Sequence, residues 1–173
     1  KRSMTLNLKH PSGVALFKEM VRGADVVVEN YRPAVKHRLG VDYETLAAIN
    51  PRLVYASISG FGDTGPDATR PGYDLIVQGE SSMMNITGAP DTPPFKMGTS
   101  IADMVSGMAL TQGILAALYD RRVSHKGQHV KVSMLEALSA LLTYHASNYF
   151  ATGVSSERRG NAHPSIVPYE TFQ

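Results

Sequence analysis

The stretch ADVVVENYRPAVKHRLGVDYETLAAINPRLVYASISG, residues 24–60, decides the fold class of this chain. Three consecutive valines inside Asp25–Glu29 are typical of a strand that is buried on both faces. Pro33 suits the first turn of a short helix, and Tyr43–Ile49 has the pattern of a second one. Another strand is predicted at Leu53–Ser59. Strands that alternate with short helices predict an α/β fold, with a Rossmann-like parallel sheet and flanking helices.

The segments on both sides extend this pattern. Ser3–Leu8 alternates like a strand, and Ser12 is the expected N-cap of a helix over Gly13–Arg22. The elements expected downstream are a helix at Leu75–Asn85, a long helix at Ile101–Arg122, an edge or amphipathic strand at Gly127–Ser133 and a second long helix at Met134–Phe150. We assign residues 1–150 to the central part of one large α/β domain. Residues 151–173 contain Gly and Pro at intervals and are expected to begin an extended linker.

Composition excludes several classes of protein. The net charge of +2 is small, and the basic residues are scattered, so a nucleic-acid-binding protein is not expected. No apolar run approaches membrane-spanning length, so no membrane partner is expected. The chain has no Cys, which excludes disulfides, cysteine–zinc sites and thiol nucleophiles and fits a cytoplasmic location. Any thioester chemistry must therefore use a thiol brought by a cofactor.

A second stretch, RPGYDLIVQGESSMMNITGAPDTPPFKMGTSIADMVSG, residues 70–107, places Asp103 in the first turn of the predicted long helix. Such an Asp commonly interacts with the helix dipole and the free N–H groups. The same position can also hold a carboxylate ionised and pointing outward, which suits a nucleophile. Gln78 and Glu80 are expected to be solvated or to make local hydrogen bonds.

Other catalytic and binding motifs are missing from the sequence. No Ser lies in a G-x-S-x-G motif, and no GxGxxG or Walker motif is present. None of the six histidines has a metal-binding spacing, so no metal is expected. The chain begins without Met and ends without a helix stop, so we expect it to be the middle of a longer protein.

Several motifs in one order resemble CoA-transferase family III, which includes formyl-CoA and carnitine CoA-transferases and the related α-methylacyl-CoA racemases. Besides residues 70–107, the segments that carry the resemblance are KRSMTLNLKHPSG, ADVVVENYRPAVKHRLG, LVYASISGFG and KGQHVKVSMLEAL, which together cover nearly the whole chain. In the family, the Asp of the matching motif is the catalytic carboxylate, which implies that role for Asp103. A nucleotide-binding segment precedes this region in the family and a small domain follows it, so residues 151–173 would lead towards that small domain.

The resemblance also implies a binding site for coenzyme A. Arg38 would take a phosphate, with Lys9 as a weaker candidate, because phosphates call for Arg and Lys. Tyr73 would lie against the CoA arm near the catalytic carboxylate. Leu6 would contact the adenine, and Asn30 and Tyr31 would line the pantetheine and nucleotide path. The full set of implied CoA contacts is Leu6, Lys9, Asn30, Tyr31, Arg38 and Tyr73. The position of Asn30 at a strand end fits, since ligands of parallel sheets bind beyond the carboxyl ends of strands.

The implied activity is transfer of CoA from an acyl-CoA donor to a small carboxylic acid, through an aspartyl anhydride and an aspartyl-CoA thioester. One alternative is an acyl-CoA racemase or epimerase, in which Asp103 would move an α-proton. Racemase relatives carry His where Tyr73 stands, and Tyr is a poor proton shuttle at neutral pH, which favours the transferase. Another alternative is a non-catalytic CoA-binding fragment. Family members form interlocked homodimers, so the resemblance implies the same assembly here.

Overall fold

The structure is a computed structural model that describes residues 1–172. Its helices and strands, in chain order, are α1 (Pro11–Val21), β1 (Val26–Glu29), α2 (Pro33–Leu39), α3 (Tyr43–Ile49), β2 (Val54–Ser59), α4 (Asp74–Glu80), α5 (Met83–Ile86), α6 (Ile101–Ser124), β3 (His129–Ser133), α7 (Met134–Ser139), the 3₁₀ turn η1 (Ala140–Leu142) and α8 (Tyr144–Thr152). The strands form one sheet in the order β1-β2-β3, and both pairings are parallel. The predicted parallel α/β fold is therefore confirmed.

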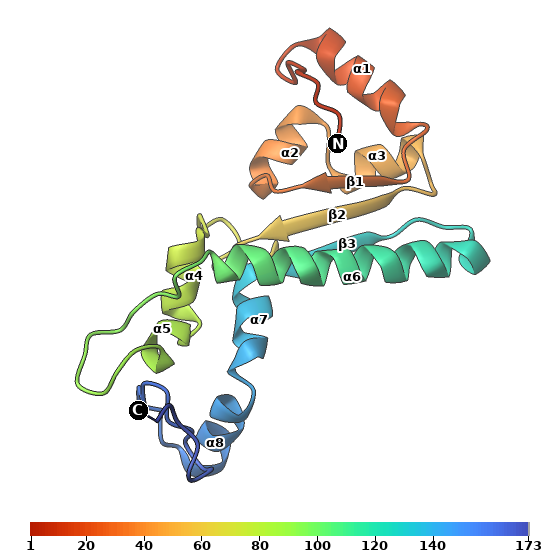
Figure 1. Ribbon diagram of the computed structural model, residues 1–173. Helices are drawn as coiled ribbons and strands as arrows, with labels where there is room; N and C mark the ends of the chain where they lie inside the picture. The colour runs from red at the N-terminus through yellow and green to blue at the C-terminus, as the bar shows by residue number, and fades with distance from the viewer. Residues whose placement is uncertain (173) are drawn as a thin grey trace.

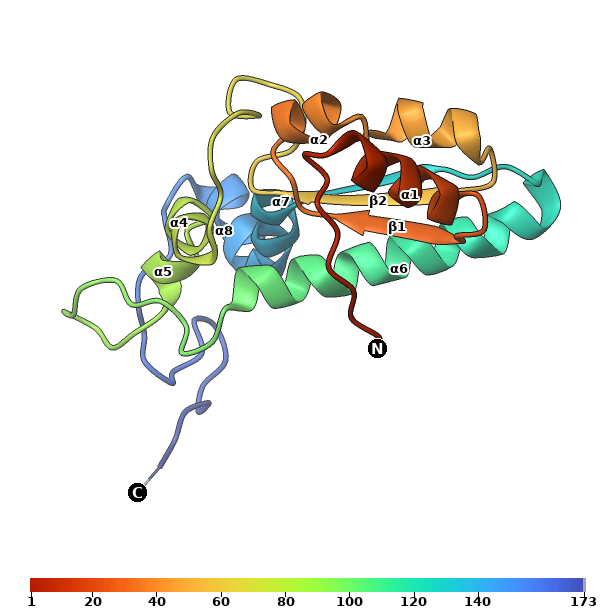
Figure 2. The ribbon, with the colours of Figure 1, turned by 90° about the horizontal axis from the view of Figure 1, so that it is seen from above.

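Helices cover both faces of this sheet (Figures 1 and 2). The helices α1, α2 and α3 lie on one face, and α6 runs along β2 and β3 on the other. The core between α1, α3 and the sheet is built from Val21, Val41, Leu46, Leu53 and Tyr55, all nearly inaccessible to solvent. The Tyr55 hydroxyl donates a hydrogen bond to the Val41 carbonyl oxygen over 2.8 Å, so this polar group is satisfied inside the core.

A second core lies where α4, α5, α6 and α7 meet, beyond one end of the sheet (Figure 1). Its buried members are Val77, Met83, Ala102, Met134 and Leu138. Leu138 lies on α7, which starts directly after β3 and leads away from the sheet towards α8. The first turn of α6 is thus packed between the sheet and this second core.

The prediction of a strand at Ser3–Leu8 is wrong. This segment pairs with no strand of the described chain, and Asn7 instead closes a turn by accepting a hydrogen bond from the His10 amide over 3.1 Å. Leu6 is only half-buried, so the apolar residues alternate along this segment although no sheet packs against them. The N-cap of α1 is His10 rather than Ser12, because the His10 ring nitrogen accepts from the Ser12 amide.

Two predicted helices are interrupted. The helix expected at Leu75–Asn85 divides into α4 and α5 at Ser82, and the one expected at Met134–Phe150 divides at Thr143. Both residues have a positive φ, 66° for Ser82 and 44° for Thr143, which a right-handed helix does not allow. The apolar spacing continues across both breaks, so it did not reveal them.

The expectation that β1 is buried on both faces is also wrong. Val28 is 60% exposed, because β1 is an edge strand of the described sheet and α6 lies along β2 and β3 instead. The prediction of an edge strand near Gly127–Ser133 is confirmed by β3. Beyond α8 the chain is irregular, as expected, and its first part is tied to α5 and the turn after it: the Asn85 side chain donates to the Ser156 carbonyl over 3.0 Å, and the Gly160 amide to the Gly88 carbonyl over 2.9 Å.

By length and composition, α6 could cross a membrane, contrary to the expectation that no apolar run approaches that length. A mostly buried core helix meets the same criterion, but only 22% of the apolar stretch of α6 is buried. In this fold α6 packs along the sheet and against α4 and α7. Near its C-terminal end, Arg121 donates to the Asp25 carboxylate over 2.6 Å and to the Arg52 carbonyl over 2.9 Å, which fixes the helix to the sheet edge.

Candidate functional site

Asp103 lies in the first turn of α6 with its side chain exposed. A residue on another helix caps this turn: the Asp74 Oδ1 atom accepts hydrogen bonds from the amides of Ala102, over 2.8 Å, and Asp103, over 3.4 Å. Within residues 1–172 the Asp103 carboxylate itself makes no capping hydrogen bond. Capping of the helix N-terminus, the common structural role of an Asp at a helix start, is therefore performed by Asp74. The Asp103 carboxylate is left available to contact a ligand.

The loop before α6 is held by Gln78 of α4, which is fully buried. Its Oε1 atom accepts from the Met97 amide over 2.8 Å, and its Nε2 atom donates to Asp74 Oδ2 over 2.6 Å and to the Thr99 carbonyl over 3.4 Å. Gln78 is therefore not solvated, and its bond to Asp74 is the local one that was expected, whereas its bonds to Met97 and Thr99 span 19 and 21 residues. The one signal for this role was the i,i+4 spacing of Asp74 and Gln78, which places both on one helix face.

The pKa of the Asp103 carboxyl is raised above its ordinary value, first by partial desolvation of this exposed group and then by the nearby negative charge of Asp74. The helix N-terminus was expected to favour the ionised form. Desolvation and like charge act in the opposite direction here. The result is a carboxylate that is more basic than an ordinary Asp side chain.

A cleft of about 170 Å³ lies at the carboxyl ends of β1 and β2 and brings together three of the predicted CoA contacts, Asn30, Tyr31 and Tyr73. The Asn30 side chain donates to the Ile58 carbonyl over 2.6 Å, which ties this turn to β2. Tyr73 is 68% exposed and immediately precedes Asp74. Tyr73 lines the cleft, and the next residue in the chain, Asp74, caps the helix that carries Asp103.

Two glycines build the wall of this cleft. Gly60 follows β2, Gly72 precedes α4, and their backbones touch so closely that a Cβ on either would overlap the other residue's Cα. Only glycine permits this approach. The contact brings the loop that carries Tyr73 against the end of the central strand.

The predicted phosphate ligands lie in a different, larger hollow of about 570 Å³ beside α1 and α2. Lys9 and Arg38 line it together with Lys18, and Leu8, Val14 and Leu39 supply apolar walls. Clustered cations beside apolar side chains suit a phosphorylated nucleotide. Leu6, the predicted adenine contact, lines neither hollow.

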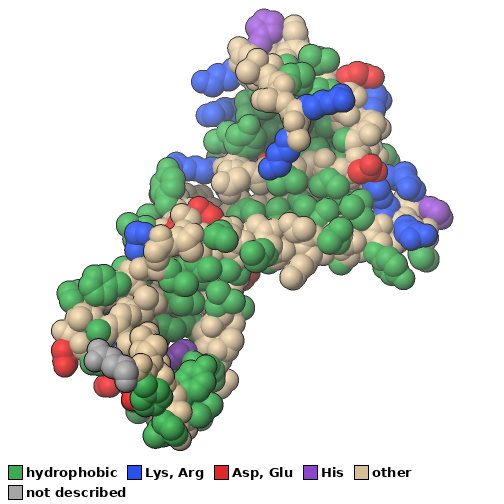
Figure 3. All heavy atoms as spheres, viewed as in Figure 1, with side chains coloured by type: hydrophobic (Ala, Val, Ile, Leu, Met, Phe, Trp, Pro, Cys, Tyr) green, Lys and Arg blue, Asp and Glu red, His purple; other side chains and the backbone are tan. Residues whose placement is uncertain are grey.

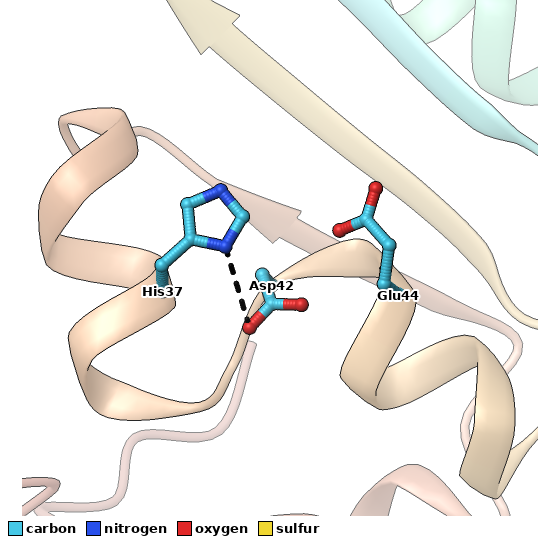
Figure 4. Close-up of side chains that lie close together, drawn as sticks. All are labelled: His37, Asp42 and Glu44. Carbon is cyan, nitrogen blue, oxygen red and sulfur yellow. Dashed lines mark ion pairs between the residues drawn. The ribbon is translucent and has the colours of Figure 1, made fainter.

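The structure also reveals a group of possible metal-ligating side chains that sequence spacing did not indicate: His37, Asp42 and Glu44 (Figure 4). Their donor atoms lie within 4.8 Å of one another. The Asp42 carboxylate already caps α3, since it accepts from the Thr45 amide and hydroxyl, both over 3.0 Å. His37 Nδ1 lies 3.8 Å from Asp42 Oδ2; the His37 side chain is exposed, whereas the Asp42 side chain is buried. We assign no metal to this group, and the absence of a metal remains a prediction.

Comparison with known proteins identifies the family of this chain. A family model described as CoA-transferase family III matches residues 1–173. The chain belongs to this family. It is 50% identical over 174 residues to an acetyl-CoA:oxalate CoA-transferase of Acetobacter aceti, covering 100% of this chain and 45% of that protein. It is 47% identical over 170 residues to a succinate–glutarate CoA-transferase of Agrobacterium fabrum, covering 98% and 42%.

Solved structures share the fold of this CoA-transferase family III chain. A CAIB/BAIF family protein from Brucella suis superimposes with a TM-score of 0.94 at 44% identity, covering 100% of this chain and 46% of that one. A protein from Mycobacterium tuberculosis superimposes with a TM-score of 0.81 at 31% identity, covering 87% and 42%. The chain thus spans less than half the length of these relatives.

Proposed function

We propose that the intact protein containing this chain is a CoA-transferase that moves CoA from an acyl-CoA donor to a small carboxylic acid, with Asp103 as the covalent carboxylate. One observation carries the proposal: Asp74 takes over the capping of α6, which leaves the Asp103 carboxylate available, and Asp74 directly follows Tyr73, which lines the cleft. Membership of CoA-transferase family III supports the reaction class.

The proposed reaction needs no nucleophile from the protein other than Asp103. An Asp103 oxygen attacks the thioester carbonyl, the C–S bond breaks, and a mixed anhydride and CoA thiolate result. The thiolate then attacks the aspartyl carbonyl, releases the donor acid and forms an aspartyl-CoA thioester. The acceptor carboxylate attacks this thioester, the aspartyl C–S bond breaks, and a second mixed anhydride and free CoA thiolate result. CoA thiolate finally attacks the acceptor acyl carbon, which yields the new acyl-CoA and restores the Asp103 carboxylate.

The two hollows divide the recognition of CoA between them. Arg38 and Lys9 would bind phosphate groups in the hollow beside α1 and α2, where charge-assisted hydrogen bonds are available. Asn30, Tyr31 and Tyr73 would guide the pantetheine arm towards Asp103. Residues 30–38 connect the two sites, because the cleft turn leads directly into α2.

The test is mass spectrometry of the intact protein after incubation with an acyl-CoA. The names of the two relatives suggest acetyl-CoA with oxalate and succinyl-CoA with glutarate as the first pairs. We expect a hydroxylamine-sensitive acyl or CoA adduct on the peptide that contains Asp103, and loss of both adduct and transfer in Asp103→Asn. Asp120→Asn, at the other end of the same helix, is the matched control and should transfer normally.

Two results would contradict this proposal. Substantial turnover in Asp103→Asn would exclude the covalent mechanism. Exchange of the substrate's α-proton without any adduct would instead indicate the racemase alternative.

A further inference from the structure

A buried ion pair joins the end of β1 to the middle of α2. The Lys36 Nζ atom lies 2.9 Å from Glu29 Oε1, and the two side chains are only 7% and 5% exposed. Taking both charges out of water is costly, and a pair of apolar residues of similar volume often stabilises a fold as well or better. A contribution to stability is therefore a weak explanation for this ion pair, and its geometry suggests a different role.

The second oxygen of Glu29 is used for a different purpose. Glu29 Oε2 accepts a hydrogen bond from the Tyr31 amide over 2.7 Å. One carboxylate thus connects the Lys36 ammonium group to the main chain of the turn that lines the candidate cleft. The Asn30 side chain fixes the same turn from the other side through its 2.6 Å bond to the Ile58 carbonyl.

The Lys36 ammonium group is itself held by the sheet. It lies 3.5 Å from the hydroxyl of Ser57, the residue of β2 that is in register with Glu29. The Ser57 hydroxyl is 2.8 Å from the Nε2 atom of His129 on β3. Burial, with the positive charges of Lys131 and Lys36, lowers the pKa of His129 to about 4, so this ring is neutral near pH 7 and adds no charge beside Lys36. A series of polar contacts therefore extends across all three strands, from His129 on β3 to Glu29 on β1. It reaches the cleft turn through the bond between Glu29 and the Tyr31 amide.

We infer that Lys36 is a positioning residue for acyl-CoA: through Glu29 it fixes the main chain at Tyr31, and so the shape of the turn that receives the CoA arm. Only the identity of the ligand rests on the proposed function. Lys36 does not line that cleft, although it lines a neighbouring hollow of about 150 Å³ together with Tyr31. Its link to the cleft turn is the Glu29 carboxylate, which bonds both the Lys36 ammonium group and the Tyr31 amide. A turn fixed before binding loses less conformational freedom when the ligand arrives, which favours affinity.

The experiment measures CoA affinity by calorimetry and unfolding temperature for the intact protein and three variants. In Lys36→Met the unpaired Glu29 charge should lower the unfolding temperature, and the dissociation constant for CoA should rise about tenfold or more. In the double variant Lys36→Met with Glu29→Met, no unpaired charge is buried, so stability should recover. Its CoA affinity should remain weak, because the loss of Glu29 removes the acceptor of the Tyr31 amide.

Asn50→Ala is the matched control for a general structural effect. The Asn50 side chain donates to the carbonyls of Val21 and Ala24, over 3.0 and 2.9 Å, away from the cleft turn. This variant should unfold earlier and bind CoA as tightly as wild type. The inference is overturned if the double variant binds CoA like wild type, or if Asn50→Ala weakens binding as much as Lys36→Met. The experiment measures binding and not transfer. A protein that binds CoA but transfers no acyl group would therefore refute the proposed reaction and leave the inference about Lys36 standing.

Discussion

Single residues set the chemistry of the candidate site, and Asp74 has the largest influence on Asp103. Its Oδ1 atom caps α6, and its negative charge is the second cause, after partial desolvation, of the raised pKa of the Asp103 carboxyl. A carboxyl with a raised pKa is ionised only at higher pH. A reaction that requires the carboxylate therefore loses rate as pH falls through that raised value.

This gives a prediction for Asp74→Asn. The amide oxygen can still accept from the Ala102 amide, but the negative charge is gone, so the pKa of Asp103 should fall part of the way towards its ordinary value. The acid limb of the kcat/KM profile against pH should shift to lower pH. An unchanged acid limb, with Asp103→Asn inactive, would show that Asp74 does not influence the titration of the nucleophile.

The residues expected to act on the ligand were easier to predict from the sequence than those that support them. Asn30, Tyr31 and Tyr73 line one cleft as a set, although their contact with CoA stays a prediction. The roles of Asp74 and Gln78 were not predicted, because they bind main-chain groups 28 and 19 residues away. A hydrogen bond that a side chain accepts from a distant amide depends on the fold and cannot be predicted from the types of the two residues.

At the scale of helices and strands, the packing of α6 on β3 decides which glycines can be replaced. A Cβ at Gly113 would lie 2.6 Å from the Val130 Cγ1 atom, whereas a Cβ at Gly107, in the same helix, would meet nothing within 4 Å. Gly107→Ala should stabilise the protein by about 0.5–1 kcal/mol, because alanine loses less backbone freedom in a helix. Gly113→Ala should destabilise it by about 1–3 kcal/mol through overpacking.

Urea unfolding of the two variants checks this pair. Since both substitutions are Gly→Ala in one helix, the difference between them isolates the contact with β3. Equal free energies of unfolding for the two variants would mean that α6 does not approach β3 as closely as the structure shows.

Elements with a single uninterrupted pattern were predicted within a few residues, and elements that end at an unusual backbone angle were not. The bounds of α3 match the expectation, and α6 runs from Ile101 as expected to Ser124, two residues further than predicted. The breaks at Ser82 and Thr143 occur at non-glycine residues with positive φ, which apolar spacing cannot detect. The strand expected at Ser3–Leu8 failed for another reason: alternation predicts a pleated strand only where a neighbouring strand is available to pair with it.

For the whole molecule, the most prominent feature is apolar surface that this chain leaves uncovered. Hydrophobic side chains are exposed along α6 and over the end of the molecule that contains α8 (Figure 3). The exposed members on these two helices are Met104, Met108, Leu115, Tyr119, Val123, Tyr144, Tyr149 and Phe150. Contiguous apolar surface of this kind marks a contact with other protein. If the intact protein is as long as its relatives, the rest of its chain could cover this surface, or a second copy of the protein could.

We predict the second copy: the intact protein should be an obligate homodimer in which residues 151–173 lead away from the large domain, as the resemblance to interlocked family members implies. Light scattering at micromolar concentration should give twice the chain mass, and Val123→Glu or Phe150→Glu should lower the unfolding temperature or release monomer, because a charge would then be buried in the interface. Lys131→Glu, away from these two helices, is a charge-change control that should stay dimeric. A stable monomer at that concentration, in which the rest of the chain covers α6 and α8, would show that the linker and homodimer predictions are both wrong.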